Sequence, residues 1–87
     1  MNWNGFVEMT LFIDEHPMGT FNEKTLNEQQ NSSRDEFGIM HKNILYNKEK
    51  DKVFCILDAP NKEAVEKHHN KAGLKCESVT EVRNTAW

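Results

Sequence analysis

The second half of the chain constrains the fold most, because it carries clear boundary signals for a strand, a helix and another strand. The apolar run at residues 53–57 predicts a buried strand. Pro60 and Asn61 predict the start of a helix, with Asn61 as its N-cap, and Gly73 predicts the end of that helix. Residues 77–82 predict the closing strand. A helix placed between two strands in this way has to cross one face of a sheet.

The first half of the chain repeats this pattern. Residues 7–14 predict a strand, and its near-continuous apolar character indicates burial on both faces. Thr20 and Glu23 have the spacing of a capping box, which predicts a helix over residues 21–37 that Gly38 ends. The apolar stripe of this helix is thin, so the helix either lines a polar pocket or packs loosely.

The complete order of elements is β-α-β-β-α-β, an α+β arrangement. Residues 39–46 predict a strand, and the charged, turn-like residues 47–51 join it to the next strand as a hairpin. Right-handed crossovers in this order favour a ferredoxin-like fold, a four-stranded antiparallel sheet with two helices on one face. We expect a single domain over residues 6–83, with loose ends at residues 1–5 and 84–87.

The small size of the chain indicates that it needs a partner. The chain has 87 residues, of which 37% are hydrophobic, and a domain of this length buries only about 60% of its unfolded surface. The predicted strands are apolar on both sides, whereas the helices cover one face only. We therefore expect a homodimer in which a second copy covers the bare face of the sheet.

Charge and hydropathy exclude several classes of partner. The net charge is −3 and no run of Lys and Arg is present, so nucleic acid is not a predicted partner. No apolar run has the length of a membrane span and no secretory signal is recognisable, so we expect a cytoplasmic protein without a membrane partner. Cys55 is predicted to be a core residue, and without a C-x-x-C motif neither Cys55 nor Cys76 predicts a thiolate zinc site.

Polar residues at the end of the first strand and of the second helix predict a metal site. Asp14 and His16 are two residues apart, so they share one face of a strand. In a ferredoxin-like fold this strand and the second helix run in the same direction, which brings His68 and His69 to the same end of the domain. Imidazoles and a carboxylate suit nickel or another divalent transition metal such as copper, zinc or iron. We expect Asp14, His16 and His68 to be ligands, with His69 in reserve.

Plainer interpretations of the same residues remain open. Asp14 and His16 could be polar residues at a strand end. His68 lies on the predicted inward stripe of its helix, where a histidine is more often a hydrogen-bonded core residue than a ligand, and His69 lies about 100° around the helix, which predicts exposure. His41 begins the second strand, at the opposite end of the domain, and is predicted to be a surface residue.

No catalytic signature is present in the sequence, so an enzyme is not the leading hypothesis. A Gly-rich phosphate loop, a G-x-S-x-G elbow and an H-E-x-x-H helix are all missing. Two alternatives to metal binding stay open. One is an enzyme of the dimeric α+β barrel kind, acting on a small apolar molecule between sheet and helices. The other is a dimerisation or small-ligand-binding module that has lost a metal site.

Several short motifs are distributed over nearly the whole chain. The block F-C-x-x-x-A-P at residues 54–60 is the most specific of them. It is followed by His68, by Gly73 and Leu74, and by the ending V-x-E-V. The opening L-F-I-D-x-H and the F-G-I junction at residues 37–39 complete the set. Together these motifs resemble those of a family of small nickel-binding proteins with a ferredoxin-like fold.

The resemblance extends over residues 10–82 and implies a ferredoxin-like homodimer. It also implies nickel binding through histidines and additional oxygen ligands, and it places Asp14, His16 and His68 at motif positions.

Two histidines of the family are missing from this chain. Asn27 stands in place of one on the first helix, and Ala72 in place of one on the second. These changes imply weaker nickel binding or a more oxygen-rich site, for which His69 or Glu28 could compensate.

Overall fold

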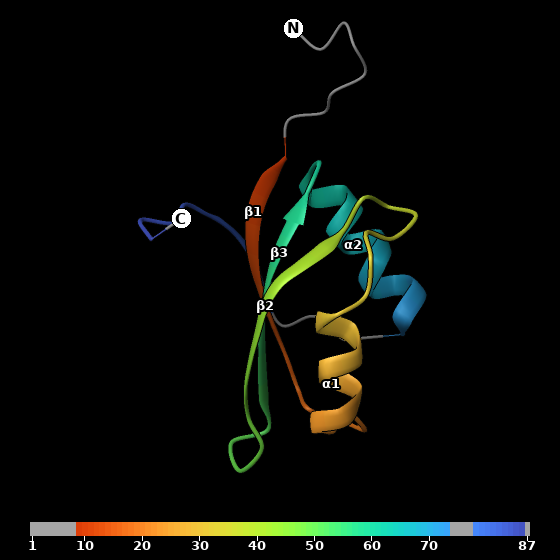
Figure 1. Cartoon of the computed structure of the whole chain (residues 1–87), viewed down its shortest axis with the longest axis vertical. Helices are drawn as coiled ribbons and strands as arrows, with labels where there is room; N and C mark the ends of the chain where they lie inside the picture. Colours follow the sequence, from red (N-terminus) through yellow and green to blue (C-terminus); the bar gives the residue numbers. More distant parts are fainter. Residues whose placement is uncertain (1–8, 74–77, 87) are drawn as a thin grey trace, which may run out of the picture.

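The computed structural model describes residues 9–73 and 78–86 of the 87-residue chain. Its elements in chain order are β1 (Thr10–His16), α1 (Glu23–Gln30), β2 (Met40–Asn47), β3 (Lys52–Ala59), α2 (Lys62–Ala72) and β4 (Ser78–Val82) (Figure 1). The predicted loose end at residues 1–5 and Cys76 lie outside the described residues. Among the described helices, none is long and apolar enough to cross a membrane.

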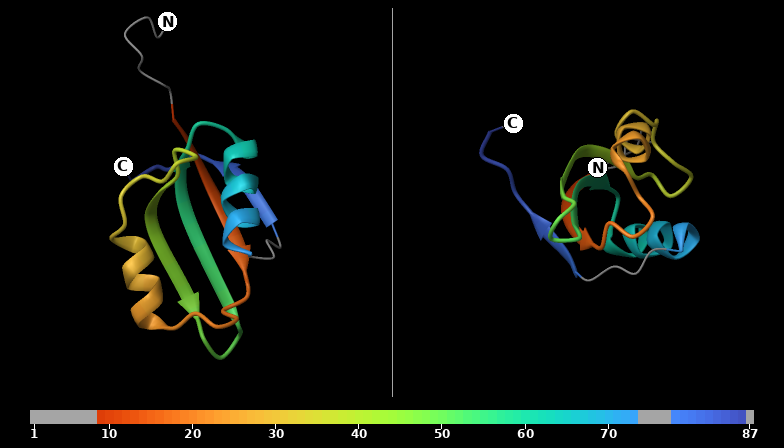
Figure 2. Two further views of the ribbon diagram at one scale, coloured as in Figure 1. Left: turned by 90° about the vertical axis from the view of Figure 1, so that its right-hand side faces the viewer. Right: turned by 90° about the horizontal axis from the view of Figure 1, so that it is seen from below.

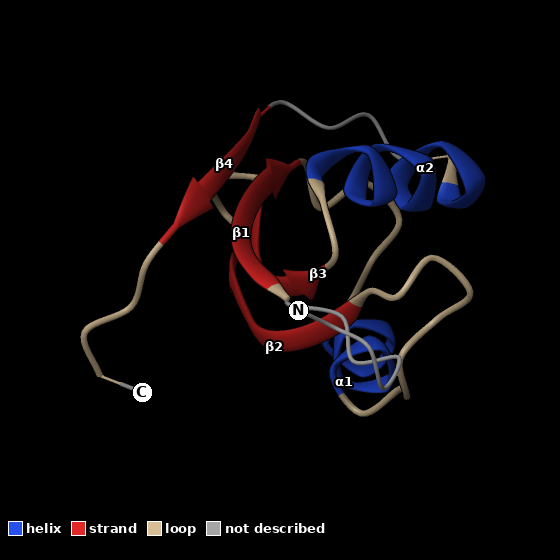
Figure 3. Cartoon of the chain, turned by 90° about the horizontal axis from the view of Figure 1, so that it is seen from above, coloured by secondary structure: helices blue, strands red, loops and turns tan. Residues whose placement is uncertain are grey.

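The four strands form one antiparallel sheet in the order β2-β3-β1-β4. Both helices lie on the same side of this sheet, with α1 against β2 and α2 against β3 and β4 (Figure 2 and Figure 3). The ferredoxin-like α+β fold that the order of elements predicts is thereby confirmed. One face of the sheet is turned toward the helices, and the other face is turned away from them.

The face of the sheet that meets the helices carries the hydrophobic core. Along β3 every second side chain is buried, beginning with Val53 and ending with Ala59. Val65 of α2 and Leu26 of α1 close over this surface and belong to the same cluster of buried residues. Cys55 is part of this cluster and is 2% exposed, as expected for a core residue.

Strand β1 has one buried face rather than two. Phe12, Asp14 and His16 are buried, whereas Leu11 and Ile13 between them are only partly covered. The prediction of burial on both faces is wrong, because both helices pack on one side of the sheet and no described segment covers the other side (Figure 3). Asp14 and His16 therefore point into the core, and two of the three apolar residues of β1, Leu11 and Ile13, point outward.

Helix α1 begins two residues later than predicted. Its N-cap is Asn22 rather than Thr20. The Asn22 side chain accepts a hydrogen bond from the backbone N–H of Thr25, and the Thr25 hydroxyl accepts one from the backbone N–H of Asn22, both at 2.9 Å. This reciprocal pair is a capping box, built from Asn22 and Thr25 in place of Thr20 and Glu23.

Helix α1 also ends at Gln30, seven residues before the predicted end. The amide of Asn31 and the hydroxyl of Ser32 each donate a hydrogen bond to a carbonyl of the last turn, at 2.9 Å and 2.7 Å. Side chains of this kind compete with the backbone for helix hydrogen bonds, and they stop the helix here. Gly38 consequently lies in the loop before β2 and does not cap the helix.

Asp35 organises the loop between α1 and β2. One of its carboxylate oxygens accepts hydrogen bonds from the backbone N–H groups of Phe37, at 2.8 Å, and Ile39, at 3.0 Å. Gly38 adopts a φ of +83°, a left-handed conformation that favours glycine. The loop therefore holds Asp35 rigidly and leaves its second oxygen available to α2.

Helix α2 begins and ends as predicted. The Asn61 side chain accepts a hydrogen bond from the backbone N–H of Ala64 at 2.8 Å, which is the expected N-cap contact. Gly73 forms the C-cap with a φ of +70°. These two caps fix the length of the helix that carries His68 and His69.

Candidate metal centre

Three buried side chains on neighbouring strands lie close enough together to be ligands of one metal ion. Asp14 and His16 belong to β1, and Cys55 of β3 stands opposite Asp14 in the ladder between these strands. Side chains alternate along a strand, so all three point toward the helices. A carboxylate oxygen, an imidazole nitrogen and the sulfur lie within 4.8 Å of one another, and each residue is at most 2% exposed.

His16 is held in the tautomer that can bind a metal. Its Nδ1 lies 2.9 Å from the carbonyl oxygen of Pro17. A carbonyl only accepts hydrogen bonds, so Nδ1 carries the proton and Nε2 keeps its lone pair. Nε2 faces the cluster, 3.7 Å from the sulfur of Cys55. A backbone carbonyl behind the distal nitrogen is the usual support of a metal-bound histidine.

Asp14 is a buried carboxylate without a hydrogen-bond donor among the described residues. It is 1% exposed, and neither of its oxygens accepts a hydrogen bond. Nε2 of His69 lies 2.9 Å from one oxygen, but this close approach lacks hydrogen-bond geometry. Buried polar groups are almost always paired, because leaving a charge unpaired in the interior is costly. A cation between the carboxylate and the imidazole would satisfy both, so the residues fit a metal ion.

His69 is buried, at 4% exposure, and the prediction that it is exposed is wrong. The sequence of α2 holds two series at helical spacing, one from Ala64 through His68 and one from Val65 through His69. The helix is rotated so that Val65, the more apolar anchor, is fully buried. His69 lies one helical turn after Val65, so its side chain also faces the sheet. Its Nδ1 is also buried without a hydrogen-bond partner in the described part of the chain.

His68 points away from this cluster, toward the loop that precedes β2. Its Nδ1 lies 2.5 Å from the free oxygen of Asp35. Partial burial raises the pKa of Asp35, but hydrogen bonds from the Ile39 backbone, the His68 side chain and the Phe37 backbone outweigh it and lower this pKa below its usual value. Asp35 is therefore an anion that accepts the Nδ1 proton of His68.

His41 is buried, at 8% exposure, and its assignment to the surface is wrong. It stands opposite Leu57 in the ladder between β2 and β3, so it faces the helices. Burial, together with the charge of nearby His68, lowers the pKa of His41 to about 4. His41 is therefore neutral near pH 7. The sequence places His41 and His16 at different ends of the sheet, and α2 spans the distance between them.

The rings of all four histidines of the chain form one row where α2 packs on the sheet. The ring centroids of His16 and His69 are 6.3 Å apart, those of His69 and His68 are 5.6 Å apart, and those of His68 and His41 are 5.6 Å apart. The end of β1 and the end of α2 thus meet, as the fold predicts. His69, rather than His68, makes the direct contact with Asp14.

A hollow of about 210 Å³ lies beside His16. It is lined by His16, by residues of the connection from β1 to α1 and by Gly73 at the end of α2. Metal sites need a path for the ion to enter. This hollow offers such a path from solvent to His16.

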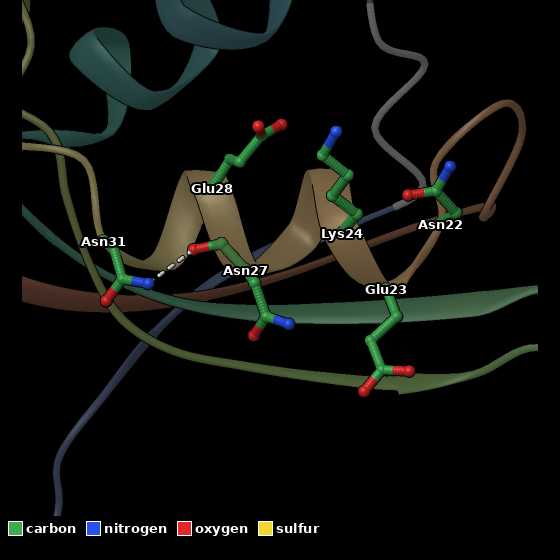
Figure 4. Close-up of a pocket in the computed structure, with 6 residues that line it drawn as sticks. All are labelled: Asn22, Glu23, Lys24, Asn27, Glu28 and Asn31. Carbon is green, nitrogen blue, oxygen red and sulfur yellow. Dashed lines mark hydrogen bonds between the residues drawn. The ribbon is translucent and has the colours of Figure 1, made fainter.

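Asn27 and Glu28 of α1 lie outside the buried cluster. Both are exposed, and both line an open hollow on the outer side of α1 together with Asn22, Glu23, Lys24 and Asn31 (Figure 4). Ala72, at the end of α2, is exposed as well. Glu28 therefore has no place in the cluster, and among the two proposed substitutes His69 alone contacts it.

Cys55 is the residue of the cluster that sequence reasoning overlooked. Its apolar neighbours in the sequence correctly predict a core position. They give no sign that Cys55 stands opposite Asp14 in the sheet. Strand register is the signal that could have found it, because pairing β1 with β3 in an antiparallel sheet fixes which residues face each other. A carboxylate, imidazoles and a thiol together suit a transition metal better than magnesium or calcium, which prefer oxygen ligands alone.

Comparison with models of protein families identifies a family for this chain. Residues 12–82 match the model described as nickel responsive protein, SCO4226-like. No curated protein and no solved structure matches the chain.

Proposed function

The chain belongs to the SCO4226-like family of nickel responsive proteins, and from this premise we propose that it binds a divalent transition metal, nickel first among them, in a buffering or sensing role. We expect this role in the cytoplasm. The observation that carries the proposal is the buried carboxylate of Asp14, which has no hydrogen-bond donor among the described residues and an imidazole nitrogen 2.9 Å away.

The proposed ligands come from three elements. Asp14 supplies a carboxylate oxygen, and His16 supplies Nε2 because its other nitrogen is bonded to a carbonyl. His69 supplies the imidazole that α2 holds against Asp14. Cys55 stands within reach as a fourth ligand. A thiol that joins such a site loses its proton, and the soft sulfur favours nickel, copper or zinc over harder ions.

We also propose that the protein is a homodimer through the face of the sheet that the helices leave bare. Leu11, Ile13, Ile56 and Val82 line a hollow of about 370 Å³ on this face. Leu45 of β2 lies on the same face and is 49% exposed. A second copy presenting the same surface would cover these side chains about a two-fold axis, as is usual for homodimers.

Nickel titration of a pair of variants tests the metal site. Asp14→Asn keeps the shape of the side chain and removes its charge, so nickel affinity at this site should fall by at least about 10-fold. Glu28→Gln makes the same chemical change at an exposed residue and should bind nickel like the wild type. Calorimetry gives the affinities, and the NMR signals of the histidine rings identify which residues respond. Unchanged affinity in Asp14→Asn, or no movement of the His16 and His69 signals, would refute the proposal.

The alternative of a module that has lost its metal site receives less support. Asn27 and Ala72, the substitutions on which that alternative rests, are exposed positions, and the buried cluster is assembled without them. The enzyme alternative rests on the polar positions, Gln30 and Ser33, in the inward stripe of the predicted helix. Gln30 donates a hydrogen bond to the carbonyl of His41, and Ser33 lies beyond the end of α1.

A further inference from the structure

We propose that the protein has a second divalent-metal site, formed by the imidazoles of His41 and His68 and positioned by Asp35. Its ligands would be distinct from Asp14, His16, His69 and Cys55. The ion would be a transition metal that accepts imidazole nitrogen, with water or a small anion in the remaining coordination positions.

His68 has the support that a metal-bound histidine needs. Its Nδ1 donates to the carboxylate of Asp35 at 2.5 Å, which leaves the lone pair on Nε2. Asp35 is itself fixed, because its other oxygen accepts two backbone hydrogen bonds from Phe37 and Ile39. A carboxylate behind a histidine orients the ring and raises its basicity as a ligand.

His41 supplies the second imidazole. It is 8% exposed, and its side chain forms no hydrogen bond with the residues that the structure describes. Its backbone is anchored on both sides, by the pairing of β2 with β3 and by a hydrogen bond from the Gln30 side chain to its carbonyl at 3.3 Å. Unlike the oxygens of Asp14, the ring nitrogens of His41 are not fully buried, so an ion can reach them.

The two rings lie at a separation that one ion can bridge. Their centroids are 5.6 Å apart and their planes are inclined at 62°. Ligand nitrogens bind such ions at about 2 Å, so one nitrogen from each ring can reach an ion placed between the two imidazoles. His68 retains 16% of its side-chain exposure, so an ion can reach the site from solvent.

The site is adjacent to the first one but does not depend on it. His68 and His69 are neighbours on α2, and their ring centroids are 5.6 Å apart. His69 turns toward β1, whereas His68 turns toward β2 and the loop that holds Asp35. One helix thus presents two successive histidines to two separate groups of partners.

Native mass spectrometry with nickel chloride counts the ions bound to each chain. We expect two ions for the wild type, one for His41→Gln, one for Asp14→Asn, and none for the double variant. Lys67→Gln, the same replacement at the exposed neighbour of His68, should keep two. One ion in both the wild type and His41→Gln, or two ions in His41→Gln, would overturn the second site while leaving the first intact. Two ions in Asp14→Asn would instead refute the first site.

His68→Gln provides a second route if His41→Gln does not fold. His68 is only partly buried, and a glutamine there can still donate a hydrogen bond to Asp35. It should also bind one ion, and retention of two would count against the proposal.

Asp35→Asn tests whether Asp35 positions His68 for metal binding or only stabilises the fold. The amide N–H₂ would face Nδ1 of His68, so the proton would move to Nε2 and block the ligand atom. The second nickel should then bind about 10–100-fold more weakly, and NMR of the metal-free variant should show the changed tautomer of His68. Unchanged binding together with a changed tautomer would contradict the assigned role of Asp35.

Discussion

Single residues in this protein are placed where ordinary folding rules would not put them. Asp14, His16 and His41 occupy core positions of the sheet, and His69 occupies a core position of α2. Apolar side chains at these places would give a better-packed core without desolvating a charge. These four polar residues therefore lower the stability of the metal-free protein. We propose that they are present because they bind metal ions.

Asp14→Asn should stabilise the protein when metal is removed. The variant eliminates a buried charge that lacks a hydrogen-bond donor, so the free energy of unfolding in urea with excess chelator should rise by about 1–3 kcal/mol. Glu28→Gln should leave this free energy unchanged, because Glu28 is exposed. A loss of stability in Asp14→Asn would show that the carboxylate has a structural partner and would contradict the interpretation.

His41 should make the metal-free protein less stable in acid. Its pKa is lowered to about 4 in the folded state, by burial first and by nearby His68 second, against an ordinary value of 6.5. The unfolded chain therefore binds this proton at higher pH than the folded protein, and stability falls as pH drops from about 6.5 to about 4.

The size of this effect is at most about 3 kcal/mol, at 1.36 kcal/mol for each unit of pKa. His41→Gln lacks the proton, so its urea midpoint should fall less than that of the wild type between pH 7 and pH 4.5. Lys67→Gln should follow the wild type. Parallel losses in the wild type and in His41→Gln would show that other groups cause the acid sensitivity.

At the scale of elements, local signals predict helix ends well where the capping side chain has no competitor. Asn61 and Gly73 bound α2 as expected. The beginning of α1 offers both Thr20 and Asn22 as caps, and its far end is a run of Asn and Ser side chains that bond to the backbone. Spacing alone cannot choose between such neighbours, because the choice depends on where Leu26, the buried residue of α1, meets the sheet.

The loop before β2 depends on a glycine for reasons of conformation and space. Gly38 has a φ of +83°, and a Cβ there would lie 3.2 Å from the side chain of Pro60. Gly38→Ala should therefore lower the free energy of unfolding by about 2–4 kcal/mol, the sum of backbone strain and crowding. It should also weaken the contact between Asp35 and His68, visible in the His68 ring signals.

Gly19→Ala is the matched control for this substitution. Gly19 also has a positive φ, of +55°, but no atom within 4 Å of the place of a Cβ. Its substitution should cost only the backbone term, about 1–2 kcal/mol. Equal losses at the two glycines would show that Pro60 does not crowd the position.

At the scale of the whole molecule, only one of the two faces of the sheet is covered by helices. The helices cover the face that carries the core and the histidine row (Figure 3). The opposite face carries partly covered apolar residues such as Leu11 and Ile13. No segment in the described part of the chain covers this opposite face, which is why we expect a second copy to do so (Figure 3).

Ile13→Lys should convert the proposed dimer into a monomer. A charge in the middle of the bare face would be buried without a partner in the dimer, and sedimentation equilibrium should then give the mass of one chain. Glu23→Lys places a lysine on α1, on the helix side of the molecule, and should leave the mass of the dimer unchanged. A wild type that sediments as a monomer would refute the dimer.

The sequence alone determined the order of elements, the fold class, both caps of α2 and the approach of the end of β1 to the end of α2. These features follow from local signals and chain connectivity, which are written in consecutive residues. The tertiary structure decided the rest. The packing of Val65 rotated His69 onto Asp14 and left His68 to Asp35. Strand register placed Cys55 opposite Asp14 and turned His41 inward, because contacts between distant segments, and not neighbours in the chain, select which side chains meet.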